Sequence, residues 1–113
     1  MKDEAQIQAT CVEWFRYHYQ QYILFSVPNE SAYKRSSYFS SLGMLNGVSD
    51  TVIVFPNTVI FVEFKAEKGK QRPEQKAFED KVSSLGYSYY IIRSFEEFKD
   101  LIYEYTDSTD SQI

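Results

Sequence analysis

The sequence has few of the residues that build several common scaffolds and sites. Its 113 residues include one cysteine, which excludes a disulfide framework and a cysteine-rich zinc site and suits a reducing compartment. No apolar run approaches the roughly 20 residues of a membrane span. The N-terminal segment is polar, so we expect no signal peptide and a soluble, cytoplasmic protein. No glycine-rich phosphate-binding loop is present, which argues against a nucleotide cofactor.

Histidine is equally scarce, and this limits the kinds of catalysis that the chain can perform. A Ser-His-Asp or Cys-His enzyme would have to use His18, and no residue pattern around it supports such a role. His18 shares the apolar stripe of the first predicted helix, so we expect a partly buried structural residue. Cys11 and Trp14 lie in the same helix and are expected in the core.

The composition predicts one globular domain. Hydrophobic residues make up 43% and charged residues 25% of the chain, which are ordinary values. We place the domain at residues 1–105 and expect a polar, flexible tail over 106–113. From Ser94 onward there are six acidic residues and one lysine. Without them the chain has 12 − 1 = 11 basic and 16 − 6 = 10 acidic residues, so the total of −4 says little about any local site.

Hydrophobic periodicity predicts a mixed sheet flanked by helices, an α/β fold. Two of the predicted strands are almost continuously apolar, so they are expected at the centre of the sheet. The strand beginning at Val59 should connect through a helix to a parallel strand beginning at Tyr87, with a right-handed crossover. Phe78, Val82 and Leu85 are expected on the inner face of that helix. The predicted helices cover 3–22, 73–85 and 94–105, with a possible short one at 31–42, and the strands cover 23–27, 51–55, 59–65 and 87–92.

Charged residues stand where the strand from Val59 should still be buried. Glu63 and Lys65 point to one face because side chains alternate along a strand. A hairpin turn at Pro56-Asn57 places Asp50 beside Glu63. Two converging carboxylates raise each other's pKa unless a cation lies between them, and Mg²⁺ prefers such oxygen ligands. The alternative is a solvated Glu63–Lys65 pair at the end of the strand, with Asp50 as an ordinary turn residue.

Two further polar residues lie on helix faces that should be buried. Glu4 falls within the apolar arc of the first helix, and Gln75 lies on the Phe78 side of its own helix. A buried acid must be paired or must reach a cation. The alternative for each is fraying of the first helical turn, where polar side chains still reach water.

These residues, in this order, resemble a known nuclease motif. Gly47-Val48-Ser49-Asp50, then Glu63-Phe64-Lys65, then Pro73-Glu74-Gln75 are similar to the PD-(D/E)xK pattern, and Glu4 and Gln75 point to its VRR-NUC branch. Ser49 stands where family members usually have proline. The resemblance implies a restriction-endonuclease-like core and a metal-dependent endodeoxyribonuclease that hydrolyses phosphodiester bonds with Mg²⁺ or Mn²⁺, in the cytosol of a bacterium or of a phage-infected host.

The resemblance also implies a role for each matching residue. Asp50 and Glu63 would ligate the metal with the Phe64 backbone carbonyl. Glu4 would bind it directly or through water. Lys65 would face the attacking water and the scissile phosphate, and Gln75 would support the arrangement. The expected substrate is structured DNA, either branched DNA or a Holliday junction, and the expected assembly is a homodimer. Candidate phosphate contacts are Lys34, Arg35, Lys68, Lys70 and Arg72, and candidate interface or base-stacking aromatics are Tyr33, Tyr38 and Phe39.

Other readings of the same residues stay open at this point. The fold could carry a weakened site that binds branched DNA or another protein without cutting it. The site could also belong to a nuclease that acts on linear DNA or RNA. The basic run before Pro73 could be a solvated loop, and the three aromatic residues could simply cover the sheet.

Overall fold

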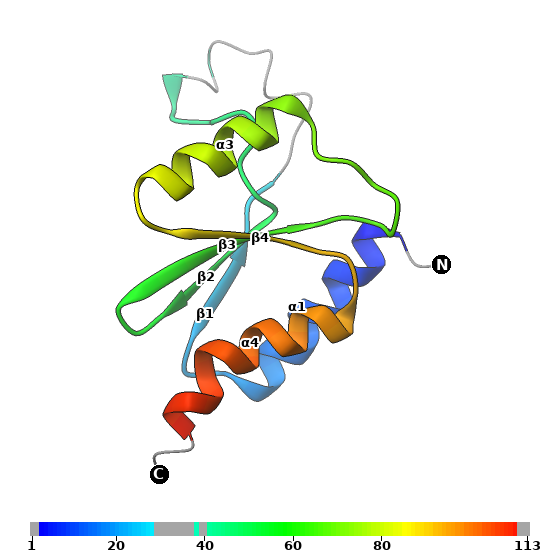
Figure 1. The fold of residues 1–113 in the computed structure, drawn as a ribbon, viewed down its shortest axis with the longest axis vertical. Coiled ribbons are helices and arrows are strands. Elements are labelled where there is room, and N and C mark those ends of the chain that lie inside the picture. The colour runs from blue at the N-terminus through cyan, green and yellow to red at the C-terminus, as the bar shows by residue number, and fades with distance from the viewer. Residues whose placement is uncertain (1–2, 29–37, 39–40, 111–113) are drawn as a thin grey trace.

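The structure, a computed structural model, describes residues 3–28, 38 and 41–110. Its helices lie on both faces of a four-stranded sheet (Figure 1). The predicted short helix at 31–42 falls mostly outside the described residues, as do Tyr33 and Phe39. The elements in chain order are α1 (Glu4–His18), β1 (Ile23–Ser26), β2 (Thr51–Phe55), β3 (Thr58–Phe64), α3 (Pro73–Ser84), β4 (Ser88–Ile92) and α4 (Phe95–Asp110).

The sheet has the order β1-β2-β3-β4, and its two apolar strands are central, as predicted. β1, β2 and β3 are antiparallel, whereas β4 pairs parallel to β3 after the α3 connection. The β2–β3 hairpin turns tightly at Pro56 and Asn57. Asn57 has φ 69°, a left-handed conformation that asparagine tolerates better than most residues. The mixed α/β architecture expected from the sequence is therefore confirmed.

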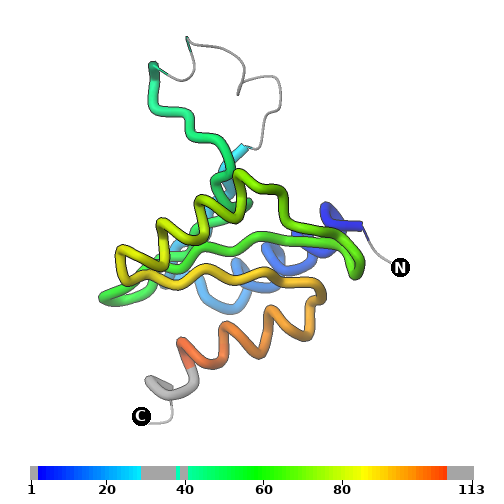
Figure 2. The backbone as a smooth tube through the Cα atoms, turned by 45° about the horizontal axis from the view of Figure 1, so that its top comes forward, coloured from blue at the N-terminus to red at the C-terminus, as the bar shows by residue number. Residues whose placement is uncertain are grey.

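The main core lies between the sheet and the pair α1 and α4, while α3 covers the opposite face (Figure 2). Phe15, Phe64 and Phe98, from α1, β3 and α4, are at most 1% exposed and form its centre. Each such side chain contributes about 1.5–3 kcal/mol by leaving water. Because side chains alternate along β3, Phe64 enters this core and Glu63 points to the opposite face, where Gln75 of α3 contacts it.

Two helix ends differ from the periodicity-based prediction. α1 ends at His18, not Tyr22, because Tyr19 leaves helical geometry (φ −130°, ψ 58°) and a turn follows, in which the Tyr22 N–H donates to the Tyr19 carbonyl. α3 ends at Ser84, so Leu85 leaves the helix face and is 70% exposed.

The last helix extends further than predicted, and this changes the start of the expected tail. α4 continues to Asp110 instead of ending at Tyr105. Thr106 is fully buried, and its Oγ1 donates to the Ile102 carbonyl at 2.9 Å and lies 3.4 Å from the Tyr19 hydroxyl. A threonine hydroxyl can donate a hydrogen bond to a carbonyl of the preceding helical turn, so a polar residue at position 106 is compatible with a continuing helix.

Two residues of α1 that were considered for chemistry occupy structural positions. Cys11 is fully buried, as predicted, and burial raises the pKa of its thiol to about 12. His18 is exposed, contrary to prediction, because it lies at the end of α1, where its ring packs on Trp14 and Tyr17. Within the described residues, no helix combines the length and apolar character needed to cross a membrane.

An arginine on α1 caps the edge of the sheet. The Val27 N–H donates to the Asp50 carbonyl at 2.8 Å, so odd-numbered residues of this segment direct their backbone groups toward β2. Leu24 therefore directs its carbonyl outward. Arg16 Nη2 donates to this carbonyl at 2.9 Å.

Candidate active site

The hairpin register brings two carboxylates together at the end of the central strands. Thr51 pairs with Val62, so the next positions outward are Asp50 and Glu63. The Asp50 N–H donates to Glu63 Oε1 at 3.2 Å, and the Phe64 N–H donates to Asp50 Oδ2 at 2.8 Å. A strand residue directs its N–H and C=O to the same side. The Phe64 carbonyl therefore lies on the Asp50 side of β3.

Lys65 and Gln75 reach the same carboxylate. Lys65 Nζ lies 3.9 Å from Glu63 Oε2, and the Lys65 side chain is 8% exposed. Gln75, in the first turn of α3, donates from Nε2 to Glu63 Oε2 at 2.8 Å, while its Oε1 accepts the Arg72 N–H at 2.8 Å. The Arg72 N–H thus fixes which end of the Gln75 amide faces the site. The NH₂ group of Gln75 faces Glu63, and the amide oxygen is turned away from the carboxylates.

Gly47 allows the turn before β2 to touch the backbone of α3. It has φ +82°, and a Cβ built there would lie 2.1 Å from the Glu74 carbonyl oxygen. Only glycine permits so close an approach in this conformation. Ser49, at the position where the motif that the sequence resembles usually has proline, is fully buried, and its Oγ donates to the Thr51 carbonyl at 3.1 Å. The hydroxyl thus fixes the turn that presents Asp50.

Burial gives the carboxylate pair unusual electrostatics. Removal from water raises the pKa of Glu63 to about 8, and the neighbouring Asp50 charge adds to this effect while Lys65 opposes it. Burial also raises the pKa of Asp50, against the lowering effect of the Phe64 N–H. Because the two groups disfavour each other's charge, the pair retains a proton near neutral pH. A divalent cation would remove that conflict, so the donor set fits a hard metal ion.

Glu4 lies at the edge of this arrangement. It is exposed and does not lie on a buried face as predicted; the first turn of α1 lies beside the loop after β3 (Figure 1). A Cβ added to Gly69 would lie 3.2 Å from Glu4 Oε2, so the carboxylate rests against this loop. The Glu4 charge still contributes to the raised pKa of Asp50. In the part of the chain that the structure describes, no three Asp, Glu, His or Cys side chains are gathered closely enough to hold a metal.

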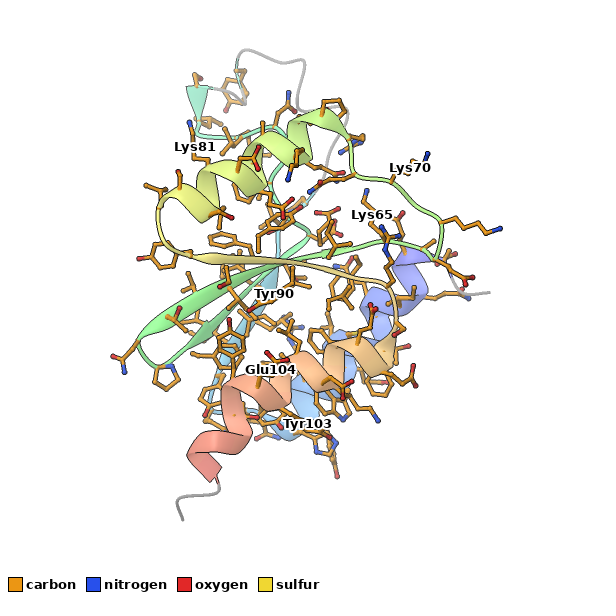
Figure 3. The ribbon with its side chains drawn as sticks, viewed as in Figure 1. Lys65, Lys70, Lys81, Tyr90, Tyr103 and Glu104 are labelled. Atoms are coloured by element: carbon orange, nitrogen blue, oxygen red, sulfur yellow. The ribbon has the colours of Figure 1, made fainter. Side chains whose placement is uncertain are left out.

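The basic candidates occupy different positions. Lys68 and Lys70 are exposed on the loop between β3 and α3, and Lys70 points away from the molecule while Lys65 lies inside the bend (Figure 3). Arg72 is half-buried, with Nε 3.2 Å from Glu74 Oε2. Lys34 and Arg35 lie outside the described residues. Tyr38 is 64% exposed.

Sequence reasoning missed one residue that contacts this region. Arg93 follows β4 and extends its guanidinium into the loop after Lys65, where Nη1 lies 2.8 Å from both the Ala66 and Gly69 carbonyl oxygens and 3.3 Å from that of Glu67. Its signal was an arginine immediately after the strand that runs parallel to β3. The signal could have been used, because parallel strands end at the same edge of a sheet.

The strand order and the helices on both faces of the sheet define a mixed α/β fold of the restriction-endonuclease-like kind. Neither a family model nor a curated protein matches the sequence. Among solved structures, this chain is similar to one described as a VRR_NUC domain protein, with TM-score 0.73 and 16% identity over 94% of this chain and 89% of that one. A second, described as a VRR_NUC domain, has TM-score 0.66 and 20% identity over 93% and 99%. The chain therefore has the fold of VRR_NUC domain proteins.

Proposed function

We propose that this protein is a Mg²⁺- or Mn²⁺-dependent endonuclease that cleaves structured DNA. The observation that carries the proposal is the convergence of Asp50 and Glu63 beside Lys65, at the end of the central strands of this fold. A buried and a half-buried carboxylate that disfavour each other's charge destabilise a small domain unless a cation compensates them. A bound divalent cation would stabilise both carboxylates in their charged form.

In this proposal Asp50, Glu63 and the Phe64 carbonyl supply hard oxygen donors on one side of β3, and Glu4, whose charge acts on Asp50, contributes through water. When bound, a divalent ion lowers the pKa of water and neutralises charge on a phosphate. The chain itself holds the donors in place, since the Asp50 and Phe64 N–H groups each fix one carboxylate oxygen. These hydrogen bonds orient the carboxylates before any ligand arrives.

Lys65 and Gln75 have separate tasks in the proposal. Lys65 holds a positive charge beside Glu63 with little access to water, and such a charge stabilises a phosphate that gains negative charge in the transition state. Gln75 positions Glu63 through its amide N–H and does not touch the reacting atoms. Lys65 is therefore the proposed catalytic cation and Gln75 a positioning residue.

Cleavage assays with purified protein test this function. The substrates are a four-way junction, a flap, linear duplex, single-stranded DNA and RNA, each with Mg²⁺, Mn²⁺ or EDTA. We expect metal-dependent product that falls by about a hundredfold or more in Asp50→Asn and in Lys65→Met, because each removes a group that stabilises developing charge. The matched control, Asp80→Asn, changes a carboxylate on the exposed side of α3 and should cleave normally.

Branched DNA and a homodimer are parts of the proposal that rest on the small size of the domain and its exposed aromatic residues. Two sites on two copies would face two strands of a junction. Preference for the junction over linear duplex, and a dimer by sedimentation at micromolar concentration, are the expected results. Cleavage of linear DNA or RNA alone would keep the site and change the substrate. The cytosolic location stays a prediction.

A non-cleaving binding module is the competing function. It is favoured by the exposed position of Glu4, which leaves two close carboxylates where the nuclease motif expects a third acid. Junction binding without product under any metal condition would support the module and contradict the nuclease.

A further inference from the structure

We infer that Arg93 is a positioning residue, which clamps the loop after β3 so that Lys65 and Glu4 stay aligned with the carboxylate pair. The inference rests on the proposed function. It concerns a residue outside the nuclease motif, directly after a different strand, β4. The loop is the segment 66–72, hereafter the basic loop, which carries Lys68 and Lys70.

The clamp is built from three carbonyl groups. Arg93 Nη1 lies within hydrogen-bond distance of the Ala66, Glu67 and Gly69 oxygens, at 2.8, 3.3 and 2.8 Å. Within the loop the Gly69 N–H donates to the Ala66 carbonyl at 3.0 Å, which closes a tight turn around the guanidinium. Hydrogen bonds from a charged donor are about twice as strong as neutral ones.

The backbone at Arg93 is held by hydrogen bonds to α4 and to the residue after β3. Its N–H donates to Glu97 Oε1 at 2.6 Å, and the Glu97 N–H donates to Ser94 Oγ at 3.1 Å, so the start of α4 holds its main chain. Immediately before it, the Ile92 carbonyl accepts the Lys65 N–H at 3.0 Å. The clamp therefore begins one residue after the last strand bond that locates Lys65.

The loop connects this clamp to two functional residues. Lys65 directly precedes Ala66, the first clamped residue, so a shift of the loop moves the Lys65 backbone. Glu4 rests against Gly69, the last clamped residue. The far end of the loop is held separately, since Gln71 Nε2 donates to Glu79 Oε1 at 3.0 Å. Loss of the Arg93 bonds would therefore loosen the half of the loop nearest the site.

The test compares Arg93→Met, Arg93→Lys and Arg16→Met. Arg16 is the matched control because it also donates to a backbone carbonyl, that of Leu24, at a distance from the site. We expect kcat to fall about tenfold or more in Arg93→Met, as displacements near 1 Å can cost a hundredfold. KM for DNA should change less than about threefold, because Lys68 and Lys70 remain. Arg16→Met should keep wild-type kcat.

Arg93→Lys separates position from charge. All three carbonyl contacts come from Nη1. A lysine keeps the charge and has three N–H donors, but its side chain is one bond shorter and lacks the planar guanidinium that places Nη1 among the carbonyls, so it should restore only part of the lost turnover. Full restoration by lysine, or wild-type kcat in Arg93→Met, would overturn the inference.

Hydrogen exchange gives a second readout that needs no cleavage. Backbone amides of the basic loop should exchange about tenfold faster in Arg93→Met, with the rest of the protein unchanged, and should not change in Arg16→Met. Unaltered exchange in the loop contradicts the clamp. Absence of cleavage by the wild-type protein with intact loop protection contradicts the proposed function and leaves the clamp standing.

Discussion

At the scale of single residues, Glu63 joins three parts of the chain through one carboxylate. It accepts hydrogen bonds from the Asp50 backbone and from Gln75, and it lies beside Lys65. These partners orient the group, but burial, together with the neighbouring Asp50 charge, still raises its pKa to about 8. The same side chain is therefore well placed and electrostatically strained.

The raised pKa predicts how stability depends on pH. The folded protein keeps a proton on Glu63 that the unfolded chain releases near pH 4.5, so its stabilising effect is full below that pH and is lost as pH rises to about 8. Without metal, we expect the free energy of unfolding to fall by a few kcal/mol across this window. Urea unfolding at a series of pH values measures it.

Glu63→Gln should flatten that pH dependence, because glutamine stays neutral. The exposed Asp100→Asn should leave it unchanged. Saturating Mg²⁺ should stabilise the wild-type protein more at pH 8 than at pH 6, since the metal competes with the proton. Equal slopes for wild type and Glu63→Gln would contradict this account of the pair.

The buried thiol of Cys11 provides a probe of whether α1 opens in the native protein. It is fully buried, and desolvation raises its thiol pKa to about 12, so little thiolate forms at neutral pH. We expect a thiol-specific reagent to label native protein only at the rate of global unfolding. Labelling should become immediate in denaturant. Rapid labelling in buffer would show that α1 opens independently of the sheet.

At the scale of elements, the contact between Gly47 and α3 determines whether Gln75 reaches Glu63. Gly47→Ala would place a methyl carbon 2.1 Å from the Glu74 carbonyl, so the turn and α3 must separate. Gly86→Ala is the control, because it has φ +90° but nothing within 4 Å. We expect Gly86→Ala to cost about 1–2 kcal/mol of stability from backbone strain alone.

Gly47→Ala should cost about 3 kcal/mol or more, because overlap is added to the same strain. Chemical denaturation of both variants measures the difference. Similar losses of stability in the two variants would mean that the turn can move away from α3 without destabilising the protein.

The elements that sequence predicted well are those with a continuous physical signal. Apolar runs located the central strands, and two-residue alternation placed Glu63 and Lys65 on one face. The register of the hairpin brought Asp50 beside them. Helix periodicity failed at the ends, where Tyr22 and Leu85 continue an apolar spacing although the backbone has already left the helix.

Other features depend on packing that no local pattern records. Glu4 fits the apolar arc of α1, yet it is exposed in the first turn, whereas Ile7 on the same face is buried. Thr106 reads as a polar tail residue, yet α4 continues and buries it. The Arg93 contacts join residues 24–27 positions apart in sequence, so only the fold brings them together.

At the scale of the whole molecule, the largest excess of acidic residues and the basic loop lie in different places. α4 carries the excess of acidic residues and covers one face of the sheet, while the basic loop and α3 lie toward the other (Figure 1). DNA should therefore approach from the side of the basic loop. The net charge of −4 does not oppose this approach, because much of it is carried by the far side.

This geometry predicts the salt dependence of DNA binding in EDTA. Each phosphate contact contributes about 0.9 to the slope of log affinity against log salt concentration. Lys70→Gln should lower the magnitude of the slope by about that amount. Lys99→Gln, on α4, should leave it unchanged. A slope that responds to Lys99 and not to Lys70 would reverse the proposed direction of approach. Fluorescence anisotropy at several salt concentrations provides the measurement.

The Arg16 cap on the Leu24 carbonyl also limits how two copies could associate. An edge strand normally offers its outward carbonyls to any neighbouring strand, and here one of the outward carbonyls is already engaged by a charged donor. A sheet running unbroken from one copy into the next through β1 would have to release that guanidinium first. A second copy is therefore more easily accommodated through side-chain contacts than by strand pairing at β1. The same hydrogen bond disfavours the growth of fibres through this edge of the sheet.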